Sequence, residues 1–500
     1  MMGAVLEENG CEVHTLVNNF RNYKDSKQIL AWILEREPDI VGFSFMTFGV
    51  NQHYELARAI KKLSPDTLVV SGGNHPTLFP EESINNGFDI TVIGEGEKPL
   101  EGIVQHLNDP TDYPLNNIKG LGFIDSTGNY KTTGPADIIQ ELDDLPFPAR
   151  HLFDQDEFRS ADGELKGYGS LIGTRGCPFQ CTFCSTSAFG PRYRRRTPQN
   201  VIDEIIHVKE TYGTDTFTFV DDQFFLKKSQ IHEICNELIE RKAKIRWNCG
   251  CRTELVSDEN LKAMKRSGCF QINFGIESGD NDTLKRIKKG NTTEDALNAV
   301  RLTKENGIKV YANFMTGFPW ETADQILNTE KFIRKLRPWA DRFSNSGVLI
   351  PVPGTDIYEE LRKEYDIEEY WLRPEYQNVG TSVYQNVNNP FEVSTWFQRD
   401  MYDDSFVQHE YFFQYRKDQK DAMFKLMFTI GVSNIRLEEG RSLRGFARIG
   451  LGYLSHLANT IHPSIEKCLT SVLLTKNASS IHDMYGVGYK KNDNRQNALV

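Results

Sequence analysis

Residues 176–184 are Gly176-Cys177-Pro178-Phe179-Gln180-Cys181-Thr182-Phe183-Cys184, and this stretch decides how the rest of the chain is interpreted. Its three cysteines have a Cys-x3-Cys-x2-Cys spacing on a short loop after the strand-like run Ser170–Thr174. Three thiolates on one loop can bind three irons of a [4Fe–4S] cluster and leave the fourth iron without a protein ligand. An open coordination position lets a metal centre bind a substrate or cosubstrate directly. Zinc is the alternative, but it usually needs four ligands, and no partnering His or Cys pair lies nearby.

This motif resembles the signature of the radical S-adenosylmethionine superfamily, in which an aromatic residue, here Phe183, often precedes the third cysteine. The resemblance covers roughly residues 150–358. It implies that Cys177, Cys181 and Cys184 hold the cluster and that S-adenosylmethionine binds the unique iron. It also implies that reductive cleavage of this cosubstrate gives a 5′-deoxyadenosyl radical. The flanking run Arg192–Arg196 narrows the resemblance to members that carry an N-terminal cobalamin-binding domain.

Composition limits the class of protein. A chain of 500 residues, 39% hydrophobic and 25% charged, has room for about two to four globular domains. The net charge of −11 argues against general nucleic-acid binding. The sequence contains no run of about 18 apolar residues, so it predicts no membrane span. Nine cysteines, three of them in one motif, favour a reducing compartment over a disulfide framework, and we expect a cytoplasmic enzyme.

Strand and helix signals alternate over residues 1–110. The expected strands are 12–17, 39–44, 67–71 and 90–93, and the expected helices are 26–35, 50–63 and 98–107. This alternation predicts an α/β domain with a parallel sheet covered by helices on both faces. Residues 111–165 follow as a hairpin, over 121–133, and a Pro-rich linker.

Ligands bind such sheets at the carboxyl ends of the strands. The residues found there include a hydroxyl and four glycines, which would let the backbone approach a large planar ligand closely. They are Ser44, Gly72, Gly73, Gly94 and Gly96. The set resembles the pocket for the nucleotide tail in a cobalamin-binding Rossmann domain. A tight turn is the alternative role of the glycine pair.

The N-terminal region departs from the cobalamin-domain pattern. Such domains open with a strand and a loop that sometimes supplies a lower cobalt ligand, whereas Met1 begins inside the first helix. We therefore expect that the first strand is missing, through truncation or a misassigned start codon, and that cobalamin binding is poor as a result. For His14, His53, His75 and His106, a surface or loop role is expected rather than axial ligation.

Alternation resumes over residues 166–360. The expected strands are 170–174, 216–220, 246–251, 271–274, 309–316 and 342–349, and the expected helices are 198–212, 229–241, 258–267, 293–306 and 323–336. Six strands joined by right-handed crossovers predict a partial (β/α)6 barrel with its active site at the strands' carboxyl ends.

The candidate cosubstrate contacts follow these strands. Through the family resemblance, Asp221 and Asp222 occupy the place of the motif that receives the methionyl ammonium, although one of them could instead cap a helix. Arg252 could pair with the methionyl carboxylate through its planar fork. Glu277 suits the ribose hydroxyls. The segment Gly317-Phe318-Pro319 resembles the backbone that lies against adenine.

Three further features complete the sequence interpretation. The run Arg192–Arg196 is expected to neutralise the cluster and the cosubstrate carboxylate or to contact the cobalamin phosphate. Cys249 and Cys251 point to one face of a strand and, with Cys235 and Cys269, are expected to be core residues. Residues 361–487 are expected to form a helical region that shapes the substrate pocket, and 488–500 a disordered tail.

The resemblance therefore implies a cobalamin-dependent radical S-adenosylmethionine enzyme that acts on a small molecule, most simply by methylating an unactivated carbon. An electron donor such as flavodoxin or ferredoxin is implied. An oxidative cyclase or rearrangement enzyme, similar to the magnesium-protoporphyrin ester cyclases, is the alternative within the superfamily. A cobalamin- or cluster-binding protein without turnover is the alternative from another class.

Overall fold

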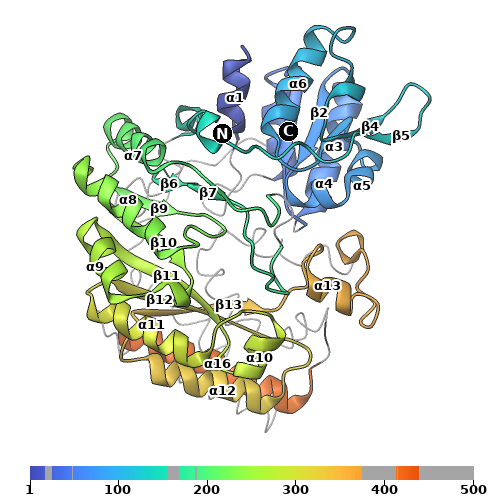
Figure 1. The fold of residues 1–500 in the computed structure, drawn as a ribbon. Helices are drawn as coiled ribbons and strands as arrows, with labels where there is room; N and C mark the ends of the chain where they lie inside the picture. The colour runs from blue at the N-terminus through green and yellow to red at the C-terminus, as the bar shows by residue number, and fades with distance from the viewer. Residues whose placement is uncertain are drawn as a thin grey trace, which may run out of the picture.

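A mixed sheet and a parallel sheet organise the part of the chain that the computed structural model describes (Figure 1). The described residues are 1–16, 25–47, 49–154, 168–185, 189–373, 413 and 415–437. One sheet has five strands and belongs to the N-terminal region, and the other has six. The predicted α/β class is confirmed. No helix in the described ranges is long and apolar enough to cross a membrane.

The N-terminal sheet has the order β1-β2-β3-β4-β5, in which the first three strands are parallel. Its strands are β1 (Ile40–Ser44), β2 (Leu68–Gly72), β3 (Ile90–Val92), β4 (Leu121–Ile124) and β5 (Tyr130–Thr132). Its helices are α1 (Met2–Glu8), α2 (Ser26–Leu34), α3 (Val50–Leu63), α4 (Asn74–Leu78), α5 (Pro80–Asn85) and α6 (Glu97–Asn108). The hairpin predicted from the sequence is β4–β5, and it extends this sheet through an antiparallel pairing with β3.

Helix α3 shows why the sequence predicted these elements well. Val50, Tyr54, Ala57 and Ile60 recur every three or four residues, and all four side chains are buried. The predicted boundaries of α3 are those observed. The short helices α4 and α5 were not predicted, because neither is long enough to show a helical period.

The strand predicted over 12–17 is wrong for residues 12–16, which lie in no strand; Val17 lies outside the described residues. A strand needs a neighbour to pair its backbone groups. Thr15 instead donates its hydroxyl to the carbonyl of Leu152, at the end of the 3-10 turn Arg150–Leu152.

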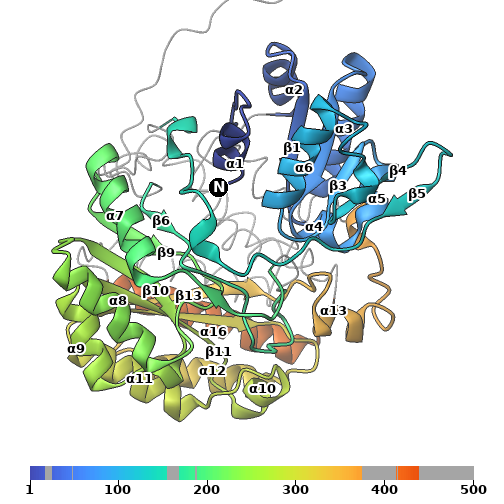
Figure 2. The same ribbon diagram turned by 45° about the horizontal axis from the view of Figure 1, so that its top comes forward.

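The second sheet is fully parallel, in the order β13-β12-β11-β10-β9-β6. Its strands are β6 (Ser170–Leu171), β9 (Thr216–Phe219), β10 (Arg246–Cys251), β11 (Cys269–Glu277), β12 (Lys309–Thr316) and β13 (Arg342–Val348). Its helices are α7 (Pro198–Tyr212), α8 (Lys228–Glu240), α9 (Asp258–Arg266), α10 (Asn281–Arg286), α11 (Thr293–Glu305) and α12 (Ala323–Leu336). Helices α7 to α12 cover the outer side of the curved sheet (Figures 1 and 2). The predicted six-stranded partial barrel is confirmed.

The strand predicted over 170–174 divides into two. β6 belongs to the barrel, whereas β7 (Thr174–Arg175) pairs antiparallel with β8 (Arg194–Arg195) in a separate ladder. Gly173 lies between β6 and β7, where its amide donates to Asp221 Oδ1 (2.8 Å). The basic run is therefore partly a strand that pairs with the residues just before the cysteine loop.

Beyond the barrel, the described elements are α13 (Asp356–Leu361), a 3-10 turn (Tyr370–Leu372) and α16 (Lys417–Leu437). Helix α16 packs against α12 and β13. At the outer edge of β13, the Asn434 side chain accepts from the amide of Phe343 (2.8 Å) and donates to its carbonyl (2.7 Å). The side-chain amide of Asn434 thus satisfies the backbone N–H and C=O of Phe343 at the edge of the sheet, as a neighbouring strand would. The remaining predictions for 361–500 lie outside the described residues.

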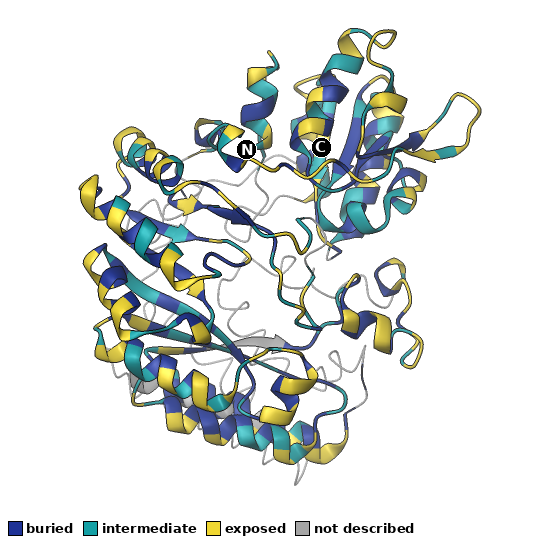
Figure 3. Ribbon diagram, viewed as in Figure 1, coloured by how far each residue is buried: buried dark blue, intermediate teal, exposed yellow. Residues whose placement is uncertain are grey.

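One hydrophobic core runs from the α2–α3 face of the N-terminal sheet through the barrel to α16. The barrel helices turn buried residues inward and exposed residues outward, as Figure 3 shows. Cys235, Cys249, Cys251 and Cys269 all belong to this core and are at most 8% exposed. The prediction that they are core residues is confirmed.

Candidate cofactor-binding site

The three motif cysteines lie on a loop that is fixed from both sides. Gly176 has φ +81°, and a Cβ there would collide with the carbonyl of Arg192, so only glycine fits. Thr182 donates its amide to the carbonyl of Ile287 (3.1 Å) and accepts from the amide of Ile357 (3.0 Å). The loop is therefore held by the end of α10 and the start of α13.

None of the three motif cysteines is fully buried. Cys177 and Cys181 are partly exposed and Cys184 is exposed. Desolvation nevertheless raises the pKa of Cys177, and raises that of Cys184 to about 11. Within the described residues, no three His, Cys, Asp or Glu side chains converge on one point as ligands of a single ion. A cubane cluster does not need such convergence, because each cysteine binds a separate iron.

The two aspartates after β9 have different partners. Asp221 accepts from Gly173 N (2.8 Å) and Thr174 Oγ1 (2.6 Å), and burial raises its pKa to about 7. Its Oδ2 is buried and has no hydrogen-bond partner among the residues that the structure describes. Asp222 is exposed toward the cysteine loop, where its charge acts on Cys177 and Cys184. Asp221 thus fixes the β6–β7 connection, and Asp222 is the aspartate that can reach a ligand.

Glu277 ends β11 in a strained conformation. Its φ is +69°, which is uncommon for a residue with a side chain and recurs at functional sites. A Cβ on Gly275 would lie 2.5 Å from Glu277 Oε1, so the carboxylate occupies the space over this glycine. The same oxygen binds Lys289 Nζ (3.0 Å), and each side chain is about one-tenth exposed.

Lys289 is a site residue that the sequence analysis missed. It lies in a loop after α10, and its ammonium also sits 6.0 Å from the ring centroid of Phe183. Its charge lowers the pKa of Cys184, against the larger effect of desolvation. Phe183 itself packs against the core, so its ring anchors the cysteine loop. The Lys289 ammonium lies over the same ring.

Arg252 has partners that the sequence did not indicate. Its guanidinium lies 3.7 Å from the ring centroid of Phe179, in the cysteine loop, and Nη2 donates to the carbonyl of Lys289 (2.5 Å). Nε pairs with Glu254. The side chain therefore clamps the loop, and its contact with a methionyl carboxylate stays a prediction.

The segment after β12 is held by a buried carboxyl. Glu321 Oε2 accepts from the amides of Gly317 (3.1 Å) and Phe318 (3.3 Å), and burial raises the pKa of Glu321 to about 8. Tyr415 donates its hydroxyl to the Gly317 carbonyl (2.6 Å). The Phe318 ring is fully buried and stacks on Trp320. Contact of Gly317, Phe318 and Pro319 with adenine stays a prediction.

The N-terminal candidates share one edge of the first sheet. Ser44 is paired with Gly72 in the ladder, and a Cβ on Gly73 would lie within 3.0 Å of Ser44 Oγ and of the Phe45 backbone. Gly94 has φ +95° and follows β3. Gly96 begins α6 and faces Met2 instead. The structure thus brings Ser44, Gly72, Gly73 and Gly94 together and places Gly96 on the side of α1.

His75 follows this edge and was wrongly expected to have a surface or loop role. It is fully buried in α4, where its ring contacts Thr47 Oγ1 (3.1 Å), Tyr54 OH (3.1 Å) and Glu82 Oε1 (3.0 Å). Trp371, beyond the barrel, donates its indole N–H to the same Glu82 (3.1 Å). The network therefore joins the first sheet to the segment after the barrel.

A buried ion cluster joins the N-terminal turn to the cysteine loop. Arg175 binds Glu95 (3.0 Å) and Glu97 (2.5 Å), and Arg194 binds Glu95 (2.5 Å). All four side chains are 3–4% exposed. Arg175 directly precedes Gly176, and Glu95 lies between the two glycines of the Gly94–Gly96 turn. We call these four residues the interdomain ion cluster.

Three of the four arginines of the basic run, Arg194, Arg195 and Arg196, pair with glutamates of the protein. Arg196 binds Glu204, a 1% exposed residue of α7 that also binds Arg150 (2.5 Å). Arg195 points outward and binds Glu233 (2.6 Å). The basic run was expected to neutralise cofactors. In the structure, the charges of Arg194, Arg195 and Arg196 are instead neutralised by glutamates.

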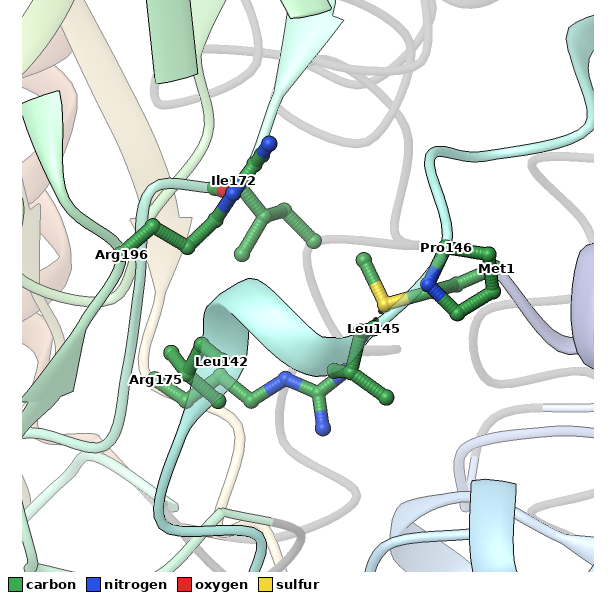
Figure 4. Close-up of a pocket in the computed structure, with 7 residues that line it drawn as sticks. All are labelled: Met1, Leu142, Leu145, Pro146, Ile172, Arg175 and Arg196. Atoms are coloured by element: carbon green, nitrogen blue, oxygen red, sulfur yellow. Dashed lines mark hydrogen bonds between the residues drawn. The ribbon is translucent and has the colours of Figure 1, made fainter. Parts of the chain in front are cut away.

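A small hollow lies beside Arg175, as Figure 4 shows. It is lined by Met1, Leu142, Leu145, Pro146, Ile172, Arg175 and Arg196. It has room for little more than a water molecule, which is too small for S-adenosylmethionine or cobalamin. It is a packing defect between the N-terminal residues and the barrel, and the chemistry lies elsewhere.

Two family models match the chain. The radical SAM superfamily model matches residues 171–333, and the B12 binding domain model matches residues 1–104. An uncharacterised methyltransferase of Pyrococcus horikoshii is 33% identical, over 66% of this chain and 71% of the relative. The anaerobic magnesium-protoporphyrin IX monomethyl ester cyclase of Rubrivivax gelatinosus is 27% identical, over 71% of this chain and 64% of that enzyme. The chain thus spans about two thirds of the length of these curated relatives.

Solved structures share the fold. The radical S-adenosylmethionine methyltransferase TsrM of Kitasatospora setae, solved with tryptophan and a cosubstrate analogue, has a TM-score of 0.61 at 23% identity. That match covers 73% of this chain and 72% of TsrM. OxsB, a cobalamin-dependent enzyme solved with aqua-cobalamin and S-adenosylmethionine, has a TM-score of 0.60 at 16% identity, over 91% of this chain and 75% of OxsB.

The interdomain ion cluster predicts a local loss of stability. Arg175→Met should lower the free energy of opening around residues 94–97 and 174–177 by about 3–5 kcal/mol, because Glu97 would stay buried without its partner and Glu95 would keep only one of its two arginines, Arg194. Hydrogen exchange followed by mass spectrometry would measure it. Lys119→Met removes an exposed pair with Asp137 and should change exchange little. Equal exchange in both variants would contradict the role of the cluster.

Glu321 predicts a pH dependence of stability. Its folded pKa is raised to about 8 from an ordinary 4.5, so the native state binds more protons than the unfolded state between these values. Its contribution is therefore complete below pH 4.5 and is lost as the pH rises toward 8. Glu321→Gln should flatten the fall in Tm over this range. A wild-type slope unchanged in the variant would show that Glu321 is not the group responsible.

Proposed function

Because the chain belongs to the radical SAM superfamily and carries a B12-binding domain, we propose that it is a cobalamin-dependent radical S-adenosylmethionine enzyme. Its reaction is methylation of an unactivated carbon of a small molecule. The observation that carries the proposal is the interdomain ion cluster, which holds the Gly94–Gly96 turn against the residue that precedes the cysteine loop. The two cofactor sites are thereby parts of one centre.

The residues present fit the cofactors. Cys177, Cys181 and Cys184 would be the ligands of the cluster, since all three lie on one loop and none of them is fully buried. Ser44, Gly72, Gly73 and Gly94 would line the cobalamin tail pocket. When bound, the cluster supplies the electron that cleaves S-adenosylmethionine, and cobalamin supplies a transferable methyl group.

The polar groups around the loop would orient the cosubstrate. Asp222 accepts hydrogen bonds from the methionyl ammonium, and Glu277 accepts them from the ribose hydroxyls. Lys289, restrained by Glu277, is the cation placed to pair with the methionyl carboxylate. Its buried position makes that pairing stronger than it would be in water. Arg252 packs its guanidinium on the ring of Phe179 and so helps to hold the cysteine loop in place.

The proposal includes a cellular context. A low-potential electron donor such as flavodoxin or ferredoxin would reduce the cluster. The described cysteines are all free, which suits a reducing compartment such as the cytoplasm.

Oxidative cyclisation is the second candidate, favoured by the 27% identity to the magnesium-protoporphyrin ester cyclase. Incubation with methyl-labelled S-adenosylmethionine distinguishes the two, because methylation transfers the label to the product and cyclisation does not. A cofactor-binding protein without turnover would form no 5′-deoxyadenosine under reducing conditions.

The cluster assignment predicts the metal content. The anaerobically reconstituted protein should bind about four iron and four sulfide per chain, as one cubane requires. Cys177→Ala, Cys181→Ala or Cys184→Ala should each abolish it, measured by iron analysis and electron paramagnetic resonance. Cys249→Ala, on the helix side of β10, is the matched control and should keep the full content. A complete cluster in any loop variant would reject the assignment.

The cosubstrate site predicts an affinity loss. Lys289→Met, Glu277→Gln and Asp222→Asn should each weaken S-adenosylmethionine binding by about 1.5–3 kcal/mol, the loss expected for a hydrogen bond to a charged group. Equilibrium dialysis of the cluster-loaded protein would measure it. Lys288→Met is the control, since the adjacent Lys288 makes an exposed pair with Asp356. Unchanged affinity in all three site variants would mean that the site lies elsewhere.

A further inference from the structure

The protein itself holds the turn that follows β12. The amides of Gly317 and Phe318 both donate to the carboxyl of Glu321 (3.1 and 3.3 Å), and the amide of Glu321 donates back to the Phe318 carbonyl (2.9 Å). The carbonyl of Thr316 accepts from the amide of Leu349 (2.8 Å), which follows β13. The barrel thus binds these groups of the turn, whereas the Gly317 carbonyl has a partner from beyond the barrel.

That partner is Tyr415, which lies two residues before α16. Its hydroxyl donates to the Gly317 carbonyl (2.6 Å), and the residue is only 6% exposed. Gln419, in the first turn of α16, donates its side-chain amide to the carbonyl of Glu321 (2.5 Å). A Cβ on Gly317 would lie 3.0 Å from the Tyr415 hydroxyl oxygen and 3.3 Å from Cε of Met423. The start of α16 is therefore packed directly on the turn.

The conformation of Gly317 explains why the turn needs these partners. Its φ is +84°, in the left-handed region that glycine adopts readily. Glycine also has more accessible conformations than any other residue, so its peptide groups keep one orientation only when fixed partners hold them. Glu321 fixes the amide side and Tyr415 fixes the carbonyl. Loss of the Tyr415 hydroxyl would release the carbonyl and let the turn populate other conformations.

The turn lies at the edge of the barrel where the cosubstrate contacts are expected. Strands β11 and β12 are parallel neighbours, and Glu277, at the end of β11, is paired with Phe314 near the end of β12. The carboxyl ends of such strands form one face of a barrel, so the Gly317 turn adjoins Glu277 there. Glu277 is the residue that the proposed function assigns to the ribose. The base attached to that ribose would lie close to the turn.

Helix α16 has other attachments that do not involve the turn. Thr429 donates its hydroxyl to Glu330 Oε1 in α12 (2.6 Å), and both residues are buried. Asn434 pairs with the backbone of Phe343 in β13. Figures 1 and 2 both show α16 running alongside α12. Removal of the Tyr415 hydroxyl should therefore loosen the turn and leave the helix in place.

We propose that Tyr415 is a positioning residue of the cosubstrate site, which fixes the Gly317 turn in the shape that receives the adenosyl half of S-adenosylmethionine. Tyr415 lies outside residues 171–333, which the radical SAM model matches, so the segment after the barrel completes this part of the site. The inference rests on the proposed function and deepens it, because it assigns Tyr415 to one half of the cosubstrate. Asp222 serves the other half, the methionyl group.

Tyr415→Phe tests the role, because it removes the hydroxyl and keeps the buried ring. In the anaerobically purified, cluster-loaded protein, it should raise the Kd of S-adenosylmethionine about three- to tenfold, as expected for the loss of one neutral hydrogen bond that keeps the turn competent for binding. Equilibrium dialysis with labelled S-adenosylmethionine would measure it. Unlabelled competitors then separate the two halves of the cosubstrate: 5′-deoxyadenosine should compete more weakly by a similar factor, and methionine should compete as in the wild type.

Two further variants distinguish positioning from a general loss of stability. Thr429→Val removes a buried hydroxyl bond of the same length from the same helix, so it should lower Tm by a similar amount and leave the affinity for each ligand unchanged. Asp222→Asn should give the opposite pattern to Tyr415→Phe, with weaker competition by methionine and unchanged competition by 5′-deoxyadenosine.

Unchanged affinities in Tyr415→Phe would overturn the inference and leave the proposed function intact. An equal loss for methionine and 5′-deoxyadenosine, or the same loss in Thr429→Val, would also overturn it, since the hydroxyl would then act only on stability. Failure of the proposed function would appear earlier, in the wild type. Cluster-loaded wild-type protein that binds no S-adenosylmethionine would reject both the function and the role of Tyr415.

Discussion

The ion pairs of Arg175 and Arg194 with Glu95 and Glu97 are the constraint on which the centre depends. The cysteine loop and the glycine turn are built by different sheets, and neither sheet alone fixes the distance between them. Two guanidinium groups and two carboxylates are removed from water together, and their desolvation is compensated only when every partner is present. The four residues of the interdomain ion cluster are therefore expected to form their contacts together or not at all. The Glu82–Trp371 contact supplies a second connection, on the other side of the first sheet.

Regular elements could be predicted from the sequence because local signals agree with the fold. Helices α7 and α12 have the predicted boundaries; each follows a threonine whose side chain caps the first turn. Strands β10 and β12 also match, since their alternating pattern separates the side packed on the helices from the inner side of the sheet. The strand predicted over 12–17 failed because alternation shows only that a strand is possible. Pairing depends on a neighbour, which the local pattern does not contain.

The candidate site could be predicted only in part, for a related reason. Its positions at strand ends follow from the parallel sheet, but the partners of each side chain come from far along the chain. Asp221 and Asp222 are equivalent in sequence, and only the position of Gly173 and Thr174 separates their roles. Lys289 in a basic pair and Glu321 after a Pro-Trp turn have the composition of surface residues. Their burial against Glu277 and the Gly317 amides depends on tertiary contacts.

The contrast between the cysteines of the loop and those of the buried core has a consequence for damage by oxygen. The loop cysteines are partly or fully exposed, whereas Cys235, Cys249, Cys251 and Cys269 are buried in the core. Oxidants attack thiolates that solvent can reach. Among the barrel cysteines that the structure describes, oxygen damage is therefore directed to a loop of nine residues, where renewed cluster insertion would restore the site without refolding the core.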